Sequence, residues 1–277
     1  MSNTQNEKIH DCYAKNELYS LYYVLGLGIK NNYSISQNSI NGLLTWITGP
    51  YLIFYDFEKS KQIGFLKNIN NKIINCVSFS KNGKFVVTGE GNCKNGEVSI
   101  YEINYDKNKQ EETHTLYSSY KYHKYGIEKI IFFNNDNYLL SIGDKDDKNI
   151  NIYDIKNKKI ISNTKYNRPI LSCDACDKFM VLCGDKFIKI YNYVNLLNDH
   201  TLGKNGIEKH LVDLAKHKEK SFISTLIYDN KSEIKIFFMT LDCYLIEMKD
   251  NSYMLNRWIY LKSPKGICLT LMKENIV

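Results

Sequence analysis

The sequence predicts an all-β protein in which a four-stranded unit recurs about five times. Four short segments share one pattern, an apolar run in which Tyr precedes an acidic or amide residue: LIFYDF (52–57), VSIYEI (98–103), INIYDI (150–155) and IKIYNY (188–193). Their tyrosines, Tyr55, Tyr101, Tyr153 and Tyr191, lie 46, 52 and 38 residues apart. Four-stranded units repeat at about 40–45 residues in one class of all-β fold. The composition agrees, since 22 Tyr and only 3 Pro favour strands over disorder.

Each tyrosine segment is preceded by two apolar segments. The nearer one ends at or near Gly, as in 42–49, 85–90, 138–144 and 179–185, and the farther one includes a turn, as in 74–84, 127–137 and 170–178. The turn residues, such as Asn82 and Gly83, favour the tight backbone of hairpins. A polar segment such as KQIGFLKN (61–68) follows the tyrosine. The unit is therefore three strands joined by turns and a polar fourth strand, which is one blade of a β-propeller.

The turn before each tyrosine segment holds a fixed position. Asp147 and Asp185 each lie six residues before their tyrosine, and Asn95 and Gly49 hold the same place before Tyr101 and Tyr55. A turn-forming residue at a constant offset fixes a hairpin relative to the third strand.

The expected domain limits follow from this repeat. A polar tail covers 1–17 and the blades cover 18–277, with approximate bounds of 30–68, 69–116, 117–165, 166–200 and 218–255 and a partial sixth blade at 256–277. The segment 201–217 is expected to be an inter-blade loop or a short helix, since Ile207, Leu211 and Leu214 have i, i+4, i+7 spacing. Closed propellers have roughly four to eight blades, and an open last strand leaves an unpaired edge. We therefore expect a chain that is incomplete or part of a longer protein.

Charge and cysteine usage narrow the class of partner and compartment. The net charge is +7, but 37 basic residues face 30 acidic ones and are spread along the chain. Nucleic-acid binders favour a clustered basic stripe, so this pattern argues against nucleic acid. No apolar run reaches the ~18 residues of a membrane span, and the N-terminus lacks the pattern of a signal peptide. Eight dispersed Cys, several in apolar runs, indicate buried thiols in a reducing compartment, cytosolic or nuclear.

The stretch HKYGIEKIIFFNNDNYLLSIGDKDDKNINIYDIKNKKIISN (123–163) resembles a WD40 blade of the mitogen-activated protein kinase-binding protein 1 family, which includes a microcephaly-associated spindle-pole scaffold. Further matches lie at 24–29, 79–91, 184–193 and 255–263, and the last is outside the repeat consensus. The resemblance implies the N-terminal part of a first WD40 propeller, cytoplasmic and linked to MAP kinase (JNK) signalling and to the spindle pole. Kinase docking and self-association would belong to a C-terminal region that this chain lacks. The chain departs from the repeat by using Tyr where most such blades use Trp. A weaker resemblance, to a ciliary WD40 protein of doublet microtubules, covers the region from HK to YDI.

The third unit contains the residues of a polar network: His123, Ser141, Asp147 and Tyr153. An Asp in the turn accepts an imidazole N–H and orients the ring toward a hydroxyl, which rigidifies the blade. Asp185 and Tyr191 hold the corresponding places in the fourth unit. Ser, His and Asp together could also indicate a catalytic site. However, their spacing belongs to the structural repeat, and no exposed nucleophile turn accompanies it. We expect a structural role and no enzyme activity.

Metal and cofactor sites are not indicated. Cys173 and Cys176 form one C-x-x-C without a second pair or His ligands at zinc spacing. The acidic turn at 144–147 lacks the glycine and distant Glu of a calcium loop. The glycines at 26–28 and 89–91 do not complete a phosphate-binding fingerprint.

The predicted function is a surface that binds other proteins. In the WD40 arrangement, loops between blades and loops between second and third strands share one face, and loops held by rigid blades carry function. This places seven residues there as partner-binding candidates: Asn71, Lys72, Glu90, Lys124, Tyr125, Asp144 and Arg168. The leading hypothesis is a scaffold of kinase-pathway or spindle-pole type, with homo-oligomers through the missing region. The alternatives are a microtubule-associated or axonemal protein, whose positive charge meets acidic tubulin, and an RNA-binding propeller face, whose binding would depend steeply on salt.

Overall fold

The computed structural model describes residues 24, 26–28, 31–92, 94–106, 111–192, 208–210, 217–229, 233–249, 254–262, 269, 271–272 and 275–276. The expected tail 1–17 and most of the segment 18–29 lie outside these residues. One 3₁₀ helix, η1 (Asn32–Ser34), precedes the strands and is capped by Asn31, whose side chain accepts the N–H of Tyr33 at 2.9 Å.

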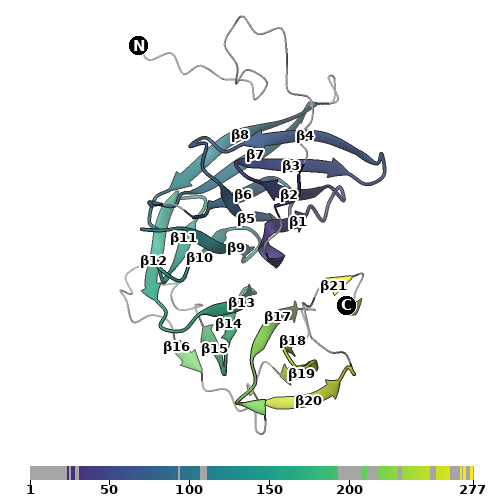
Figure 1. Cartoon of the computed structure of the whole chain (residues 1–277), viewed down its shortest axis with the longest axis vertical. Helices are drawn as coiled ribbons and strands as arrows, with labels where there is room; N and C mark the ends of the chain where they lie inside the picture. The colour runs from purple at the N-terminus through teal and green to yellow at the C-terminus, as the bar shows by residue number, and fades with distance from the viewer. Residues whose placement is uncertain are drawn as a thin grey trace, which may run out of the picture. The chain divides into compact units, whose positions relative to one another are not determined.

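The described strands form five four-stranded sheets and one small pair, and within each sheet the strands follow one another in chain order (Figure 1). Sheet I contains β1 (Ile35–Gln37), β2 (Leu44–Thr48), β3 (Tyr51–Asp56) and β4 (Lys61–Lys67). Sheet II contains β5 (Ile74–Phe79), β6 (Phe85–Glu90), β7 (Val98–Asp106) and β8 (Glu111–Tyr120). Sheet III contains β9 (Ile127–Phe133), β10 (Tyr138–Gly143), β11 (Asn149–Asp154) and β12 (Lys159–Lys165).

Two further sheets and the small pair complete the described strands. Sheet IV contains β13 (Ile170–Ala175), β14 (Phe179–Gly184), β15 (Phe187–Asn192) and β16 (Glu208–His210). Sheet V contains β17 (Phe222–Asp229), β18 (Ile234–Thr240), β19 (Tyr244–Lys249) and β20 (Leu255–Tyr260). The small pair is β21 (Leu271–Met272) with β22 (Asn275–Ile276). The prediction of an all-β chain built from repeated four-stranded units is therefore confirmed.

The chain divides into two compact units. Unit 1 comprises Met1–Phe132 and Leu139–Asn149, and unit 2 comprises Phe133–Tyr138 and Ile150–Val277. Sheets I and II thus lie in unit 1, and sheets IV and V lie in unit 2.

The repeated tyrosines all lie on third strands. Tyr55 is on β3, Tyr101 on β7, Tyr153 on β11 and Tyr191 on β15. Tyr101 and Tyr153 are buried, and Tyr55 and Tyr191 are half-buried. Burial raises the pKa of Tyr101 to about 12. The tyrosine period in the sequence therefore marks one equivalent strand in four sheets.

Apolar side chains from neighbouring sheets form the cores. In unit 1, Phe54 on sheet I and Phe79 on sheet II have ring centroids 6.3 Å apart within a cluster that draws on both sheets. In unit 2, Phe222 and Phe238 on sheet V share a cluster with Val181 on sheet IV. The same cluster buries Cys176 and Cys183 as small apolar side chains.

The hairpins inside the sheets use the turn residues that the sequence offers. Gly83 adopts a φ of 70° in the turn between β5 and β6, a left-handed conformation that side chains with a Cβ rarely adopt. Asn134, Asn135 and Asp136 adopt positive φ in the turn between β9 and β10. Asn and Asp tolerate this region better than other non-glycine residues.

The first strand of a sheet has a strand neighbour on only one side, so some of its N–H groups need another acceptor. Serine hydroxyls on the first strand of the preceding sheet supply it. Ser36 accepts the N–H of Phe79 at 3.1 Å, and Ser172 accepts that of Thr225 at 3.2 Å. Ser224 likewise accepts the N–H of Leu269 at 2.9 Å, although Leu269 lies outside the strands. Sheets I and II, and sheets IV and V, are thereby joined through their first strands.

Two expected bounds differ from the observed elements. In the segment 201–217, for which we expected a loop or a short helix, Glu208–His210 form β16, paired with β15. Residues 256–260, expected in a partial sixth blade, belong to β20 and complete sheet V. None of the described residues belongs to a helix long and apolar enough to cross a membrane.

Candidate interaction face

The candidate residues lie at one end of each sheet. Because β5 and β6 are antiparallel, Ile74 at the start of β5 pairs with Glu90 at the end of β6. The loop that enters the first strand and the hairpin between the second and third strands therefore meet there. The same holds in sheet IV, where Ile170 pairs with Gly184. We call this end of a sheet its loop end; it comprises 68–73 and 91–97 in sheet II, 121–126 and 144–148 in sheet III, and 166–169 and 185–186 in sheet IV.

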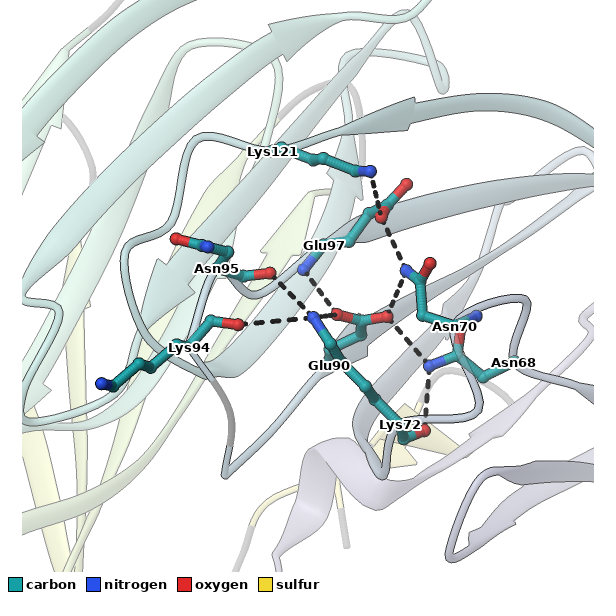
Figure 2. A network of polar contacts seen from close by, with 8 residues as sticks. All are labelled: Asn68, Asn70, Lys72, Glu90, Lys94, Asn95, Glu97 and Lys121. Atoms are coloured by element: carbon teal, nitrogen blue, oxygen red, sulfur yellow. Dashed lines mark hydrogen bonds and ion pairs between the residues drawn. The ribbon is translucent and has the colours of Figure 1, made fainter.

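A buried carboxylate organises the loop end of sheet II (Figure 2). Glu90 is 1% exposed, and its Oε1 accepts from the amides of Asn68 at 3.1 Å and Asn70 at 2.7 Å. Its Oε2 accepts from Lys72 Nζ at 3.0 Å and from the backbone N–H of Glu97 at 3.1 Å. Four donors thus compensate the burial of one negative charge.

The amine of Lys72 is fully used within the same network. Figure 2 shows it between Glu90 and the backbone carbonyls of Lys94 and Asn95, which accept at 3.3 and 3.1 Å. Three acceptors match the three N–H bonds of an ammonium group. Lys72 therefore ties the loop entering β5 to the hairpin between β6 and β7.

Glu97 adds a second carboxylate to this network. Its Oε2 lies 2.7 Å from the Asn70 amide and 3.3 Å from Lys121 Nζ. Burial opposes its charge, but hydrogen bonds from Ser119, Asn70 and Lys121 outweigh it and hold the pKa of Glu97 below its usual value. The amide of Asn70 thus bridges two carboxylates.

A second buried network organises the loop end of sheet III. His123 Nδ1 lies 2.7 Å from Asp147 Oδ2, and His123 Nε2 lies 2.6 Å from Ser141 Oγ. Asp147 Oδ1 also accepts the backbone N–H groups of Lys124 at 2.6 Å and Tyr125 at 3.2 Å. Burial opposes the charge of Asp147, but the bond from His123 and these backbone donors hold its pKa below the usual value.

The order Ser141–His123–Asp147 matches that of a catalytic triad, but its position does not. Ser141 is 0% exposed, and His123 and Asp147 are 2% and 6% exposed. A nucleophile must reach a substrate atom, and this hydroxyl lies inside the sheet. The arrangement holds a loop in place: the carboxylate orients the ring and fixes the backbone of 124–125.

The two networks are joined inside unit 1. The N–H groups of Asn95 and Gly96 donate to the carbonyls of Lys124 at 2.8 Å and Tyr125 at 3.1 Å. A Cβ at position 96 would collide with the Tyr125 carbonyl, so only glycine allows this approach. The loop ends of sheets II and III are therefore one hydrogen-bonded frame.

The frame buries three of its carboxylates and exposes most of its amines, although Asp146 is exposed and Asp144 is partly exposed. Glu90, Glu97 and Asp147 are buried. The lysines of the frame are largely exposed, and four of them form no ion pair among the residues that the structure describes: Lys94, Lys124, Lys145 and Lys148. The accessible charge of these loops is therefore more positive than their composition.

The partner-binding candidates fall into two groups. Asn71 and Lys124 are exposed, and Tyr125 and Asp144 are partly exposed, with Asp144 accepting the N–H of Gly126 at 3.1 Å. Glu90, by contrast, is buried, so the expectation that it contacts a partner is wrong. Lys72 is held by Glu90 and two carbonyls and is committed to the frame.

In unit 2, Asp185 and Arg168 lie at the loop end of sheet IV. Asp185 follows β14 directly and accepts the hydroxyl of Ser221. The N–H of Lys186 donates to the Lys220 carbonyl at 3.2 Å, so this hairpin is pinned to the loop entering sheet V. The contacts of Asp185 thus differ from those of Asp147, since the carboxylate bonds a serine and not an imidazole.

Three residues of the sheet II network were not predicted from the sequence: Asn68, Asn70 and Glu97. Asn70 stands four residues before Ile74, as His123 stands four before Ile127, and this offset was the available signal. The expected polar role of Tyr153 is not tested: Tyr153 is buried on β11.

The remaining thiols and acids do not form a metal site within the described residues. Cys173 and Cys176 are both buried. Burial raises the pKa of Cys176 to about 11, which keeps the thiol protonated.

Comparison with known proteins agrees with this architecture. Residues 61–102 match the WD40 family, described as WD domain, G-beta repeat. The match runs from β4 of sheet I through the first three strands of sheet II, so the sequence repeat straddles two sheets. The β-propeller domain of Cps50 (Swd1) from Myceliophteria thermophila is similar, with a TM-score of 0.61 and 14% identity over 86% of this chain and 75% of that one. No curated protein sequence matches the chain.

Proposed function

We propose that this chain, whose fold is that of a WD40-type β-propeller, is a non-enzymatic scaffold that holds another protein at its loop ends. The observation that carries the proposal is the joined frame of sheets II and III. Buried Glu90 and Asp147 fix the backbone of two loops, so little further ordering is needed when a partner binds.

The exposed amines of this frame indicate the charge of the partner. Lys94, Lys124 and Lys145 are exposed without an ion pair among the described residues. Such groups steer an acidic surface toward the loops and speed association at low salt. The resemblance of 123–163 to the mitogen-activated protein kinase-binding protein 1 family gives kinase-pathway and spindle-pole proteins as the first partners to examine.

The test compares two triple variants. One changes Lys94, Lys124 and Lys145 to Gln at the loop ends. The other changes Lys61, Lys84 and Lys156 to Gln; these are equally exposed but lie toward the opposite ends of sheets I to III. Quantitative affinity purification from cells should lose partners with the first variant and retain them with the second. Equal loss in both variants would overturn the loop ends as the binding surface.

A microtubule-associated role is the second candidate, favoured by the same unpaired amines. Acidic tubulin surfaces would bind them in a salt-sensitive way. Co-sedimentation with purified microtubules should weaken as salt rises and fall with the loop-end variant alone. Failure to co-sediment at low salt would exclude this candidate while leaving the scaffold proposal open to other partners.

A further inference from the structure

Arg168 occupies the position in sheet IV that Lys72 occupies in sheet II. Each stands two residues before the first strand of its sheet, which begins at Ile170 and Ile74. Each second strand also carries Gly followed by an acidic residue, Gly89–Glu90 and Gly184–Asp185. The strand register differs by one residue, because Glu90 pairs with Ile74 whereas Gly184 pairs with Ile170. Both sheets thus carry one basic and one acidic residue at their loop ends, and the acidic residue lies one position later in sheet IV.

The basic and the acidic residue form an ion pair in sheet II but not in sheet IV. Lys72 binds Glu90 at 3.0 Å, whereas Asp185 is one methylene shorter than Glu90 and accepts the hydroxyl of Ser221. Arg168 is exposed and forms no hydrogen bond or ion pair within the described part of the chain. Its five N–H donors are available to a ligand.

A hollow lies at the loop end of sheet IV. Its volume is about 360 Å³, and it is lined by Arg168, Pro169, Asp185, Lys186 and Phe187. Its wall depends on Gly184, because a Cβ there would collide with the carbonyl of Pro169 and the ring of Phe187. The absence of a side chain at 184 lets the aromatic ring lie against the loop that carries Arg168.

The lining favours an anionic group with two oxygens. Only two of the 37 basic residues are arginines, and the other, Arg257, pairs with Glu247. A guanidinium fork matches a carboxylate or phosphate through two parallel hydrogen bonds. Lys186 adds a second exposed amine, whose contact with Glu219 is long, at 3.8 Å, and solvent-exposed on both sides. Asp185 carries a negative charge and repels an anion from its own side of the hollow. An anion would therefore bind on the side of Arg168.

We propose that this hollow binds the side-chain oxyanion of an acidic segment in a partner protein, with Arg168 as the bidentate donor. The proposal rests on the scaffold function and names the chemistry of one contact. A carboxylate and a phosphorylated serine share this chemistry, and peptide probes distinguish them.

The experiment measures fluorescence anisotropy with four labelled peptides. Two are hexaglutamate and hexalysine. The other two are glycine-spaced peptides that are identical except that one carries Glu and the other phosphoserine. Arg168→Ala should weaken hexaglutamate binding by about tenfold, the size of one lost charge-assisted contact. Arg168→Lys should recover only part, because an ammonium group lacks the fork. Lys84→Ala removes an equal charge from an exposed turn far along the chain and should change affinity by less than about twofold.

Three results decide the matter. Equal hexaglutamate affinity for the native chain and Arg168→Ala would overturn the proposal. Tighter, Arg168-dependent binding of the phosphoserine peptide than of its Glu counterpart would support it and identify phosphate as the source. Displacement of hexaglutamate by oligouridylate with the same dependence on Arg168 would overturn it in favour of nucleic acid.

A second variant tests the shape of the hollow without changing charge. Gly184→Ala should reduce hexaglutamate affinity through displacement of Phe187, while Gly64→Ala, where a Cβ meets nothing within 4 Å, should not. Circular dichroism establishes that each variant is folded before binding is compared. If the loop-end lysine variant still captures partners while hexaglutamate binding depends on Arg168, the scaffold proposal alone fails. If that variant loses its partners while hexaglutamate binding does not depend on Arg168, the proposal for the hollow alone fails.

Discussion

The hydroxyl of Ser172 on β13 accepts the backbone N–H of Thr225 on β17 at 3.2 Å. Both residues are buried, and two residues farther along Asp174 Oδ2 accepts the N–H of Ile227 at 2.7 Å. Side chains of one first strand thus satisfy the backbone of the next. A sheet with a free inner edge is thereby fixed to its neighbour by directed bonds as well as by the apolar core.

Replacing Ser172 by Ala should lower the free energy of unfolding by about 1–3 kcal/mol, because the N–H of Thr225 is left buried without this acceptor. Urea denaturation measures the change. Ser39→Ala is the control, since that exposed hydroxyl donates to the Lys81 carbonyl at a site open to water. The role assigned to Ser172 fails if both variants lose the same stability.

Removal of the Asp147 carboxylate should be more damaging. Asp147→Ala leaves the backbone donors of Lys124 and Tyr125 and the ring of His123 without their acceptor. We expect a loss of about 3 kcal/mol, the range for breaking a buried charged network from one side. Thermal unfolding should show a lower midpoint, and an unchanged midpoint would contradict the structural role.

The same network can be tested from its glycine. A Cβ at Gly143 would collide with the Asp147 side chain, so Gly143→Ala should destabilise the chain although it removes no bond. Gly64→Ala is the matched control on β4, where the added Cβ meets open space and alanine restricts the unfolded chain. Comparable midpoints for the two variants would show that Asp147 can relax.

The repeat could be read from sequence because it depends on local chemistry. Tyr101, Tyr153 and Tyr191 recur at one place on third strands, where the side chains are buried or half-buried, and hairpin turns need residues such as Gly83. The Ser141, His123 and Asp147 cluster could be foreseen for the same reason, as its members keep fixed distances from their own strands.

The sequence does not predict which of the basic loop residues is already bound within the fold. Lys72 and Arg168 hold the same place before a strand, and the sequence marks both as surface candidates. One is committed and the other is not because Glu90 reaches the loop while Asp185 is bonded to Ser221, a residue from the loop entering sheet V. This difference depends on a one-residue shift in strand register, on side-chain length and on the Ser221 hydroxyl, none of which a repeat pattern encodes.

The pairing of Lys72 with Glu90 predicts a contrast between two lysines. Lys72→Ala should cost about 1–3 kcal/mol, since it leaves a buried carboxylate short of one donor. Lys121→Ala removes the amine 3.3 Å from Glu97, but that amine is 66% exposed, so the loss should stay below about 1 kcal/mol. A double-mutant cycle of Lys72→Ala with Glu90→Gln measures the coupling directly, and a coupling near zero would show that the pair is not a unit.

His114 makes stability depend on pH. Its ring stacks on Phe54 with centroids 4.2 Å apart, and burial lowers its pKa to about 4. As pH falls, His114 is therefore protonated near pH 6.5 in the unfolded chain but only near pH 4 in the folded chain. The contribution of His114 to the free energy of unfolding should be constant above about pH 6.5 and should fall by roughly 3 kcal/mol as pH drops to about 4.

His114→Phe keeps an aromatic ring against Phe54 and removes the titrating group, so the fall between about pH 6.5 and pH 4 should shrink. The contribution of Asp147 does not obscure this window, because its pKa is lowered and its stabilisation is lost only at still more acidic pH. Urea unfolding at a series of pH values compares the two chains. If both lose stability in parallel through this window, another group titrates there and the ring of His114 accepts its proton without cost.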